Sequence, residues 1–232
     1  MNPLSPLAAV RAGSPFAASH GKRKEPVYGL VVHTTGSGVP AKALKNRRGA
    51  LETAVEIYER GPNAAHYVIA HDGVIAQILP DDVIGWHVGG GAAKREQYLS
   101  GAWEQACAPA AVAAWKRAWP GVKSPQHLFP GTSVNAIYVG VELIPTIKGL
   151  GTPSPTSGGV FTEKQYLALV ALGTDLAQRH GWPALWARTP RLVGHEDVGL
   201  LDRHDAGGGW DPGTLREHPV FDFERVRKAL TP

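Results

Sequence analysis

Two apolar runs restrict the fold of this chain more than any other feature of its sequence. VYGLVVH occupies residues 27–33 and NAIYVGVELIP occupies residues 135–145. Both are short and rich in β-branched residues, which is typical of buried strands. Helical patterns alternate with these runs, and no internal repeat is visible. The order of elements predicts a single α/β domain in which helices flank a central mixed β-sheet.

Three other segments carry clear local signals. The segment 49–61, GALETAVEIYERG, has apolar residues at helical spacing and ends in a glycine. Apolar runs on either side of Asp72-Gly73 predict a β-hairpin. The clearest helix begins at a Thr162 cap and ends at Gly181. Its predicted apolar side contains Leu167, Val170, Leu172 and Leu176.

The chain length suits one domain preceded by a tail. Residues 1–26 are small and polar, contain several prolines and end in a charged cluster, which predicts a flexible N-terminal tail before a domain at 27–232. Residues 89–133 form a long helical insert with Trp103, Trp115 and Trp119. These tryptophans could widen a groove, bind a partner or form the core of an added helical subdomain, and the last is the simplest interpretation.

Composition excludes several classes of protein. The single cysteine, Cys107, rules out an internal disulfide and a multi-cysteine zinc site. No run approaches eighteen apolar residues, so we expect no membrane span. The start lacks the basic region of a secretory signal. The net charge of +4 is accompanied by no nucleic-acid motif, so we expect no nucleic-acid partner.

Three histidines follow short apolar runs at the point where a loop begins, namely His33, His87 and His195. The carboxyl ends of strands are where α/β proteins assemble their sites, and histidine is the commonest metal ligand. A later loop, HDAGGGWDPG at 204–213, carries Asp211 on a glycine-rich segment that cannot build a core. These residues alone leave a metal site and ordinary buried or surface histidines equally open.

Five segments in order resemble a known family. They are GLVVHTTGSG, AHYVIAHDGVIAQILPDDVIGWHVG, YVGVELIP, FTEKQYLALVALGTDL, and RLVGHEDV followed by WDPG. The set, from about Val27 to Gly213, resembles the zinc-dependent N-acetylmuramoyl-L-alanine amidases of the type-2 group. That group shares its fold with animal peptidoglycan recognition proteins. The resemblance implies an amidase-like catalytic domain at 27–232 that holds one Zn²⁺ per chain.

The resemblance also implies roles for individual residues. His33, His195 and Asp211 match the three zinc ligands, which leave a fourth position open for water. Glu142 matches the strand glutamate that assists this water. Tyr67 matches an active-site aromatic position, although a tyrosine packed in the hairpin explains it equally well.

The resemblance is less specific about the residues that bind substrate. His87 resembles a histidine that lines the cleft, and Trp86 beside it either stacks on a sugar or packs inward. Thr34, next to the first ligand, is a further candidate for substrate binding. The loop departs from the family pattern, because Gly209 stands where many members have a lysine or arginine. Arg203 and His204 are the candidates for this catalytic cation, and His204 is an alternative metal ligand.

The resemblance predicts an enzyme that hydrolyses the amide bond between N-acetylmuramic acid and L-alanine in peptidoglycan or a muropeptide. The alternative is a non-catalytic peptidoglycan-binding module on the same fold. A metalloprotease is not favoured, because no H-E-x-x-H helix is present. We expect synthesis in the cytoplasm, with action there or at the cell wall after passage through a holin or secretion machine. An inhibitor or immunity protein is a further expected partner.

Overall fold

A six-stranded sheet forms the centre of the computed structural model. The structure describes residues 4–11, 21–35, 47–60, 63–131, 133–147, 159–204, 211–215 and 219–232. The strands are β1 (Val10–Arg11), β2 (Gly29–Thr34), β3 (Tyr67–Ile69), β4 (Ile75–Gln77), β5 (Tyr138–Leu143) and β6 (Leu192–Gly194). They are ordered β1-β4-β3-β5-β2-β6, and among the strand pairs of the described residues only β3–β4 is antiparallel, as the predicted hairpin requires. The predicted mixed sheet is confirmed.

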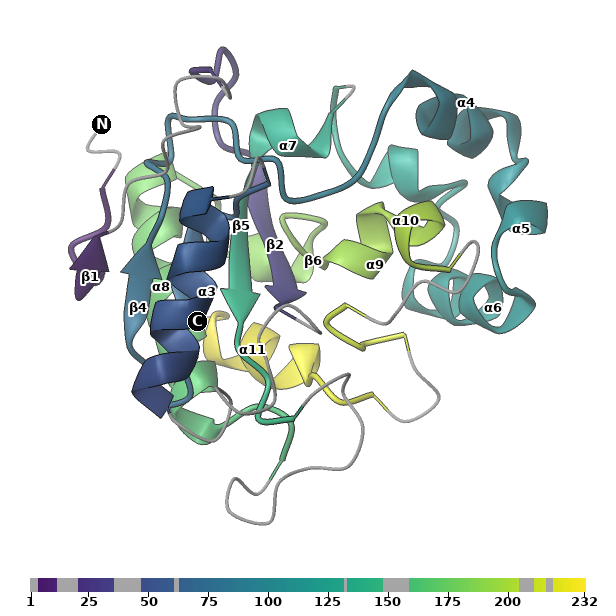
Figure 1. The fold of residues 1–232 in the computed structure, drawn as a ribbon. Helices are drawn as coiled ribbons and strands as arrows, with labels where there is room; N and C mark the ends of the chain where they lie inside the picture. The colour runs from purple at the N-terminus through teal and green to yellow at the C-terminus, as the bar shows by residue number, and fades with distance from the viewer. Residues whose placement is uncertain are drawn as a thin grey trace.

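Helices cover both faces of this sheet (Figure 1). They are α3 (Arg47–Arg60), α4 (Ala92–Ser100), α5 (Trp103–Ala106), α6 (Pro109–Ala118), α7 (Val134–Ile137), α8 (Glu163–His180), α9 (His195–Val198), α10 (Leu200–His204) and α11 (Phe223–Ala229). Two 3₁₀ turns span Pro125–Leu128 and Trp186–Arg188. Among the residues described, none of the helices is both long and apolar enough for a transmembrane segment.

The two faces of the sheet carry separate apolar cores. Alternate residues of a strand point to opposite faces, so Tyr67 and Val68 belong to different cores. One face packs on α8 and α11, and the other packs on α3 and on the helices that follow β4. In Figure 1, α3 lies in front of the sheet and α8 behind it.

The 89–133 insert is part of the domain core. Trp103 and Trp115 are fully buried in a cluster that also contains Val31 of β2 and Val193 of β6. The Trp115 indole N–H donates to the carbonyl of Asp197 at 2.8 Å. The insert therefore extends the main domain over one face of the sheet and does not form a subdomain with its own core.

The N-terminal segment also differs from the prediction of a flexible tail over residues 1–26. β1 pairs in parallel with β4 at the edge of the sheet. Ser5 is fully buried, and its hydroxyl donates to Asp175 of α8 at 2.7 Å. Residues 12–20 lie outside the described part of the chain. A strand of two residues has no sequence period, so the composition of the segment hid this pairing.

Helix α8 begins and ends where the sequence predicts. Thr162 caps its first turn in a capping box with Gln165, and Gly181 ends it in the left-handed conformation at φ 63°. Its predicted apolar side is wrong at one position, because Leu167 is 61% exposed. Leu169, which the prediction omitted, is fully buried in its place.

Leu167 and Leu169 together test which face of α8 packs in the core. We expect Leu169→Ala to lower the free energy of unfolding by about 2–5 kcal/mol, because the substitution leaves a cavity between α8 and the sheet. Leu167→Ala on the same helix is the matched control and should change the free energy by less than about 0.5 kcal/mol. Urea unfolding measures both. Equal losses in the two variants would contradict this assignment of the helix faces.

Candidate metal and catalytic site

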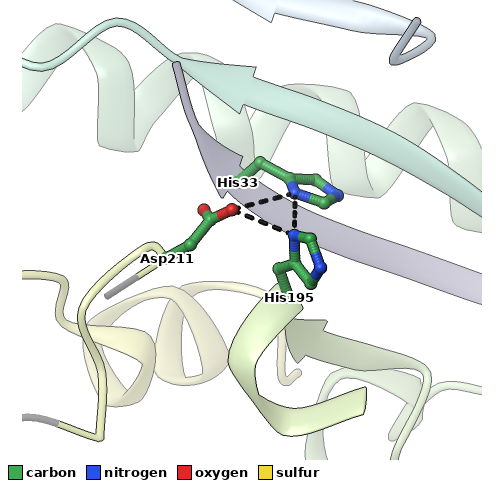
Figure 2. Close-up of side chains that lie close together, drawn as sticks. All are labelled: His33, His195 and Asp211. Carbon is green, nitrogen blue, oxygen red and sulfur yellow. Dashed lines mark hydrogen bonds and ion pairs between the residues drawn. The ribbon is translucent and has the colours of Figure 1, made fainter. Parts of the chain in front are cut away.

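The three side chains predicted as metal ligands meet at the carboxyl ends of β2 and β6. His33 lies near the end of β2, His195 begins α9 directly after β6, and Asp211 comes from the loop before α11. Figure 2 shows the three side chains pointing toward one another. All three are buried, with exposed fractions between 1% and 3%. Parallel strands bring these distant residues to one edge of the sheet.

The distances between the ligand atoms suit a tetrahedral metal ion. The Nδ1 atoms of His33 and His195 are 3.1 Å apart. Asp211 Oδ2 lies 3.4 Å from His33 Nδ1 and 3.0 Å from His195 Nδ1. Ligands bound tetrahedrally at about 2.0–2.1 Å are separated by about 3.3 Å, which agrees with this triangle. Two imidazoles and one carboxylate are also a donor set that zinc prefers.

The imidazole of His33 is held from behind by His87. His33 Nε2 lies 2.9 Å from His87 Nδ1, and His87 Nε2 lies 3.3 Å from the carbonyl oxygen of Tyr138. A carbonyl oxygen only accepts, so His87 donates from Nε2 and receives the Nε2 proton of His33. The lone pair of His33 Nδ1 therefore faces the other ligands, as metal binding requires. Gly140 leaves room for this arrangement, because a Cβ there would lie 2.6 Å from the His87 ring.

Asp211 is fixed by one backbone group on its carboxylate and by Glu196 on its loop. The backbone N–H of Thr34 donates to Asp211 Oδ1 at 2.7 Å, which leaves Oδ2 to face the histidines. The loop itself is organised by the buried carboxylate of Glu196, which accepts from the backbone N–H groups of Gly213 and Leu215 at 3.1 Å. Thr214 donates to the same oxygen from its backbone and its hydroxyl. The acid next to one ligand thus fixes the loop that carries another.

Glu142 lies opposite His33 in the β2–β5 register. The hydroxyl of Tyr58, from α3, donates to its carboxylate. Among the described residues, Glu142 Oε2 is buried without a hydrogen-bond partner. Burial, and after it the negative charge of Asp211, raise the pKa of Glu142 to about 8. This carboxyl group is poised to exchange a proton near neutral pH.

The remaining charges follow from burial and proximity. Burial lowers the pKa of His33 to about 4, so its imidazole is neutral at pH 7. Burial also acts to lower the pKa of His195, but the carboxylates of Asp202 and Asp211 outweigh it and the pKa is raised. Although burial opposes it, the two histidines keep the pKa of Asp211 below its usual range. The Asp211 carboxylate is therefore ionised whenever the protein is folded near neutral pH.

Arg203 of α10 adds a cation beside the cluster. Its Nη2 lies 2.8 Å from Asp211 Oδ2 and 2.8 Å from His195 Nδ1. A guanidinium only donates, so the lone pair of His195 Nδ1 also faces the site. Arg203 is one of the two residues that the sequence offered in place of the missing loop cation. The other, His204, ends α10, and its side chain lies outside the described part of the structure, as does Gly209.

The other predicted site residues have different surroundings. Tyr67 faces the opposite side of the sheet from Glu142, fully buried, and its hydroxyl donates to Asp81 at 2.7 Å. Its packing in the hairpin, the alternative explanation, is what the structure describes. Trp86 is 44% exposed, whereas the neighbouring His87 is partly buried with both ring nitrogens engaged. Thr34 contributes its backbone N–H to Asp211.

Two residues of the site were missed by the sequence argument. Tyr58 lies on a helix whose pattern gives no sign of a partner on another element. Glu196 was visible only as an acid following a ligand histidine, and its bonds to the Asp211 loop join residues more than fifteen positions apart.

Comparison with known families decides the class of the chain. A model of the N-acetylmuramoyl-L-alanine amidase family, Amidase_2, matches residues 23–214. The chain belongs to this family. It is therefore an amidase of the N-acetylmuramoyl-L-alanine class, a group of cell-wall hydrolases, and the match includes His33, Glu142, His195 and Asp211.

The amidase is also similar to solved structures. A crystal structure of a selenomethionine derivative of AmpD has 21% identity and a TM-score of 0.52, with 100% of this chain and 98% of that chain covered. The Ph2119 endolysin from the Thermus scotoductus MAT2119 bacteriophage Ph2119 has 14% identity and a TM-score of 0.48, with 96% and 99% covered. The likeness to AmpD shows the fold. Comparison with curated proteins gives no match.

The raised pKa of Glu142 predicts how the stability of the metal-free amidase depends on pH. In the folded protein Glu142 keeps a proton that the unfolded chain releases near its ordinary value of 4.5. Because the folded state binds more protons, this group makes the protein less stable as the pH rises from 4.5 to about 8. Glu142→Gln removes the effect and retains an oxygen that accepts from Tyr58.

We therefore expect metal-free Glu142→Gln protein to be more stable than the native protein at about pH 9, by on the order of 5 kcal/mol. The difference should shrink toward about pH 4 and below, where Glu142 is largely protonated in both the folded and the unfolded protein. Urea unfolding in the presence of a chelator measures it. A difference that stays constant with pH would show that Glu142 ionises in the folded state as it does in water.

Proposed function

We propose that this amidase is a zinc enzyme that hydrolyses the bond between the lactyl carbonyl of N-acetylmuramic acid and L-alanine, in wall peptidoglycan or its soluble muropeptides. The observation that carries the proposal is the buried triangle of His33 Nδ1, His195 Nδ1 and Asp211 Oδ2, with Glu142 on the next strand. The triangle has the dimensions of one face of a zinc tetrahedron.

His33, His195 and Asp211 would hold the metal, with the two imidazoles neutral and the carboxylate ionised. When bound, zinc supplies a Lewis acid that lowers the pKa of water and polarises a carbonyl oxygen. The chain contributes the orientation of two of the ligands: His87 directs His33, and the Thr34 backbone directs Asp211. This support from residues behind the ligands is typical of catalytic metal sites.

Glu142 is proposed to take the proton of the attacking water and deliver it to the departing amine of L-alanine. Its Oε2, which has no partner among the described residues, offers the lone pair for this water. Tyr58 donates to the carboxylate and fixes its direction. A positive ion at the ligands would lower the pKa of Glu142 from about 8 toward neutrality, where a group both accepts and returns a proton efficiently.

Arg203 is proposed to stabilise the negative charge that develops on the carbonyl oxygen. Its guanidinium already lies beside Asp211 and His195, and a preorganised cation at that position favours the transition state over the substrate. The lone pair of His195 Nδ1 accepts from one partner at a time. A metal bound there would therefore free the Arg203 N–H group that now donates to this nitrogen. Trp86, with its partly exposed indole, is proposed to pack against a sugar ring.

A binding module without catalysis is the competing function. A module needs no proton acceptor beside the ligands, and burying a carboxyl group such as that of Glu142 costs free energy. The presence of Glu142 together with all three ligand side chains favours the enzyme.

Purified peptidoglycan tests the proposal. The native protein is expected to contain one zinc per chain by elemental analysis and to release stem peptides with new L-alanine amino termini, detected by mass spectrometry. Asp211→Ala should lose both zinc and cleavage. Glu142→Gln should retain zinc and lose activity by about 10²–10⁴-fold, as expected for a missing general base. Asp82→Asn changes an exposed acid outside the cluster and serves as the control.

Full hydrolysis by the Glu142→Gln protein would remove the proposed role of that residue. A native protein that binds zinc and peptidoglycan but cuts no bond would establish the binding module in its place.

A further inference from the structure

We infer that the 89–133 insert supports the metal site through one carboxylate: Lys94 of the insert fixes Asp202, and Asp202 positions the imidazole of His195 from the side opposite the other ligands. The inference rests on the metal-binding part of the proposed function. It gives the insert a role that neither the family match nor the sequence assigns to it.

The two oxygens of Asp202 face different partners. Lys94 Nζ, on α4, forms an ion pair with Oδ1. Oδ2 lies 3.7 Å from His195 Nε2. The side chain of Asp202 is only 9% exposed, so little water competes for these contacts. A single carboxylate therefore connects the first helix of the insert with the histidine that begins α9.

The proton on His195 points toward Asp202. Arg203 donates to His195 Nδ1, so in the neutral ring the proton is on Nε2. Nε2 is buried and has no hydrogen-bond partner within bonding distance among the described residues. The carboxylate of Asp202 is aimed at it, and a movement of about 0.9 Å would close a charge-assisted hydrogen bond of about 2.8 Å. A metal at Nδ1 draws electron density from the ring and strengthens such a bond.

Two glycines leave the space that this contact needs. A Cβ at Gly89, where the insert begins, would lie 2.6 Å from the Asp202 carboxylate. A Cβ at Gly199 would lie 2.7 Å from the His195 ring and 2.9 Å from Asp202 Oδ2. Side chains at either position would push the carboxylate and the imidazole apart.

Lys94 is needed because the Asp202 carboxylate has a second possible orientation, away from His195. Both residues line an open cavity of about 510 Å³ between α4, the segment around Asn135 and α10. Without the ammonium group on Oδ1, the carboxylate can rotate into this cavity and be solvated there. The ion pair with Lys94 keeps Oδ2 directed at His195.

The test is zinc affinity, measured by competition with a chromophoric chelator. Asp202→Asn is expected to weaken zinc binding by about 10–100-fold, the usual effect of removing such a supporting group. Lys94→Met should weaken it by a smaller factor, and Lys94→Arg should restore it because the charge remains. Lys116→Met breaks an exposed ion pair with Glu104 in the same insert and is the matched control, expected to leave the affinity unchanged.

A second readout separates positioning from general stability. The visible spectrum of the cobalt-loaded protein reports the geometry of the ligands, and it should change in the Asp202→Asn and Lys94→Met variants but not in Lys116→Met. Native zinc affinity and a native cobalt spectrum in the Asp202→Asn protein would overturn the inference. If that variant does not fold, equal affinities of the Lys94→Met and Lys94→Arg proteins would overturn it.

The outcome is independent of hydrolysis. Weaker zinc binding in these variants, combined with a native protein that cuts no peptidoglycan, would support the positioning role and end the proposed reaction. Unchanged zinc binding in the variants, combined with normal cleavage, would rule out the positioning role and leave the proposed reaction in place.

Discussion

The burial of two carboxyl groups at one edge of the sheet governs the rest of this structure. Asp211 and Glu142 both lie beside His33, and burying a charge without compensation is costly. The two acids avoid this cost in different ways. Asp211 stays ionised between two imidazoles and a backbone N–H, whereas Glu142 is held neutral by burial and by its neighbour until about pH 8. One acid is thereby suited to hold a cation and the other to move a proton.

The surrounding elements are arranged to keep this pair in place. Parallel strands β2, β5 and β6 deliver His33, Glu142 and His195 to one edge. Glu196 ties down the loop that supplies Asp211, and His87 fixes the ring of His33 against Gly140. His33 and the loop that carries Asp211 are thus oriented by groups behind them, which is how a protein keeps a reactive centre rigid. The amidase chemistry of the family requires such rigidity, because a water and an amide carbonyl must meet within narrow geometric limits.

Local signals in the sequence predicted much of the fold. The Thr162 cap, the Asp72-Gly73 turn and the apolar runs around His33 and Glu142 depend on neighbours in the chain, and the structure has them as predicted. Contacts between distant segments were not predictable. β1 has only two residues, the insert tryptophans share a core with strands far along the chain, and Tyr58 reaches Glu142 from another element. The sequence also did not settle which face of the sheet Tyr67 occupies. A shift of one position along a strand moves a side chain to the opposite face, and therefore to the other core.

The central claim is that His33, His195 and Asp211 together bind one zinc ion. Anomalous X-ray scattering at the zinc absorption edge, from crystals of the zinc-loaded protein, tests it most directly. The account predicts a single peak per chain at about 2.0–2.2 Å from the Nδ1 atoms of both histidines and from an Asp211 oxygen. A zinc ion held by His204, or by His87 in place of one of these ligands, would contradict it.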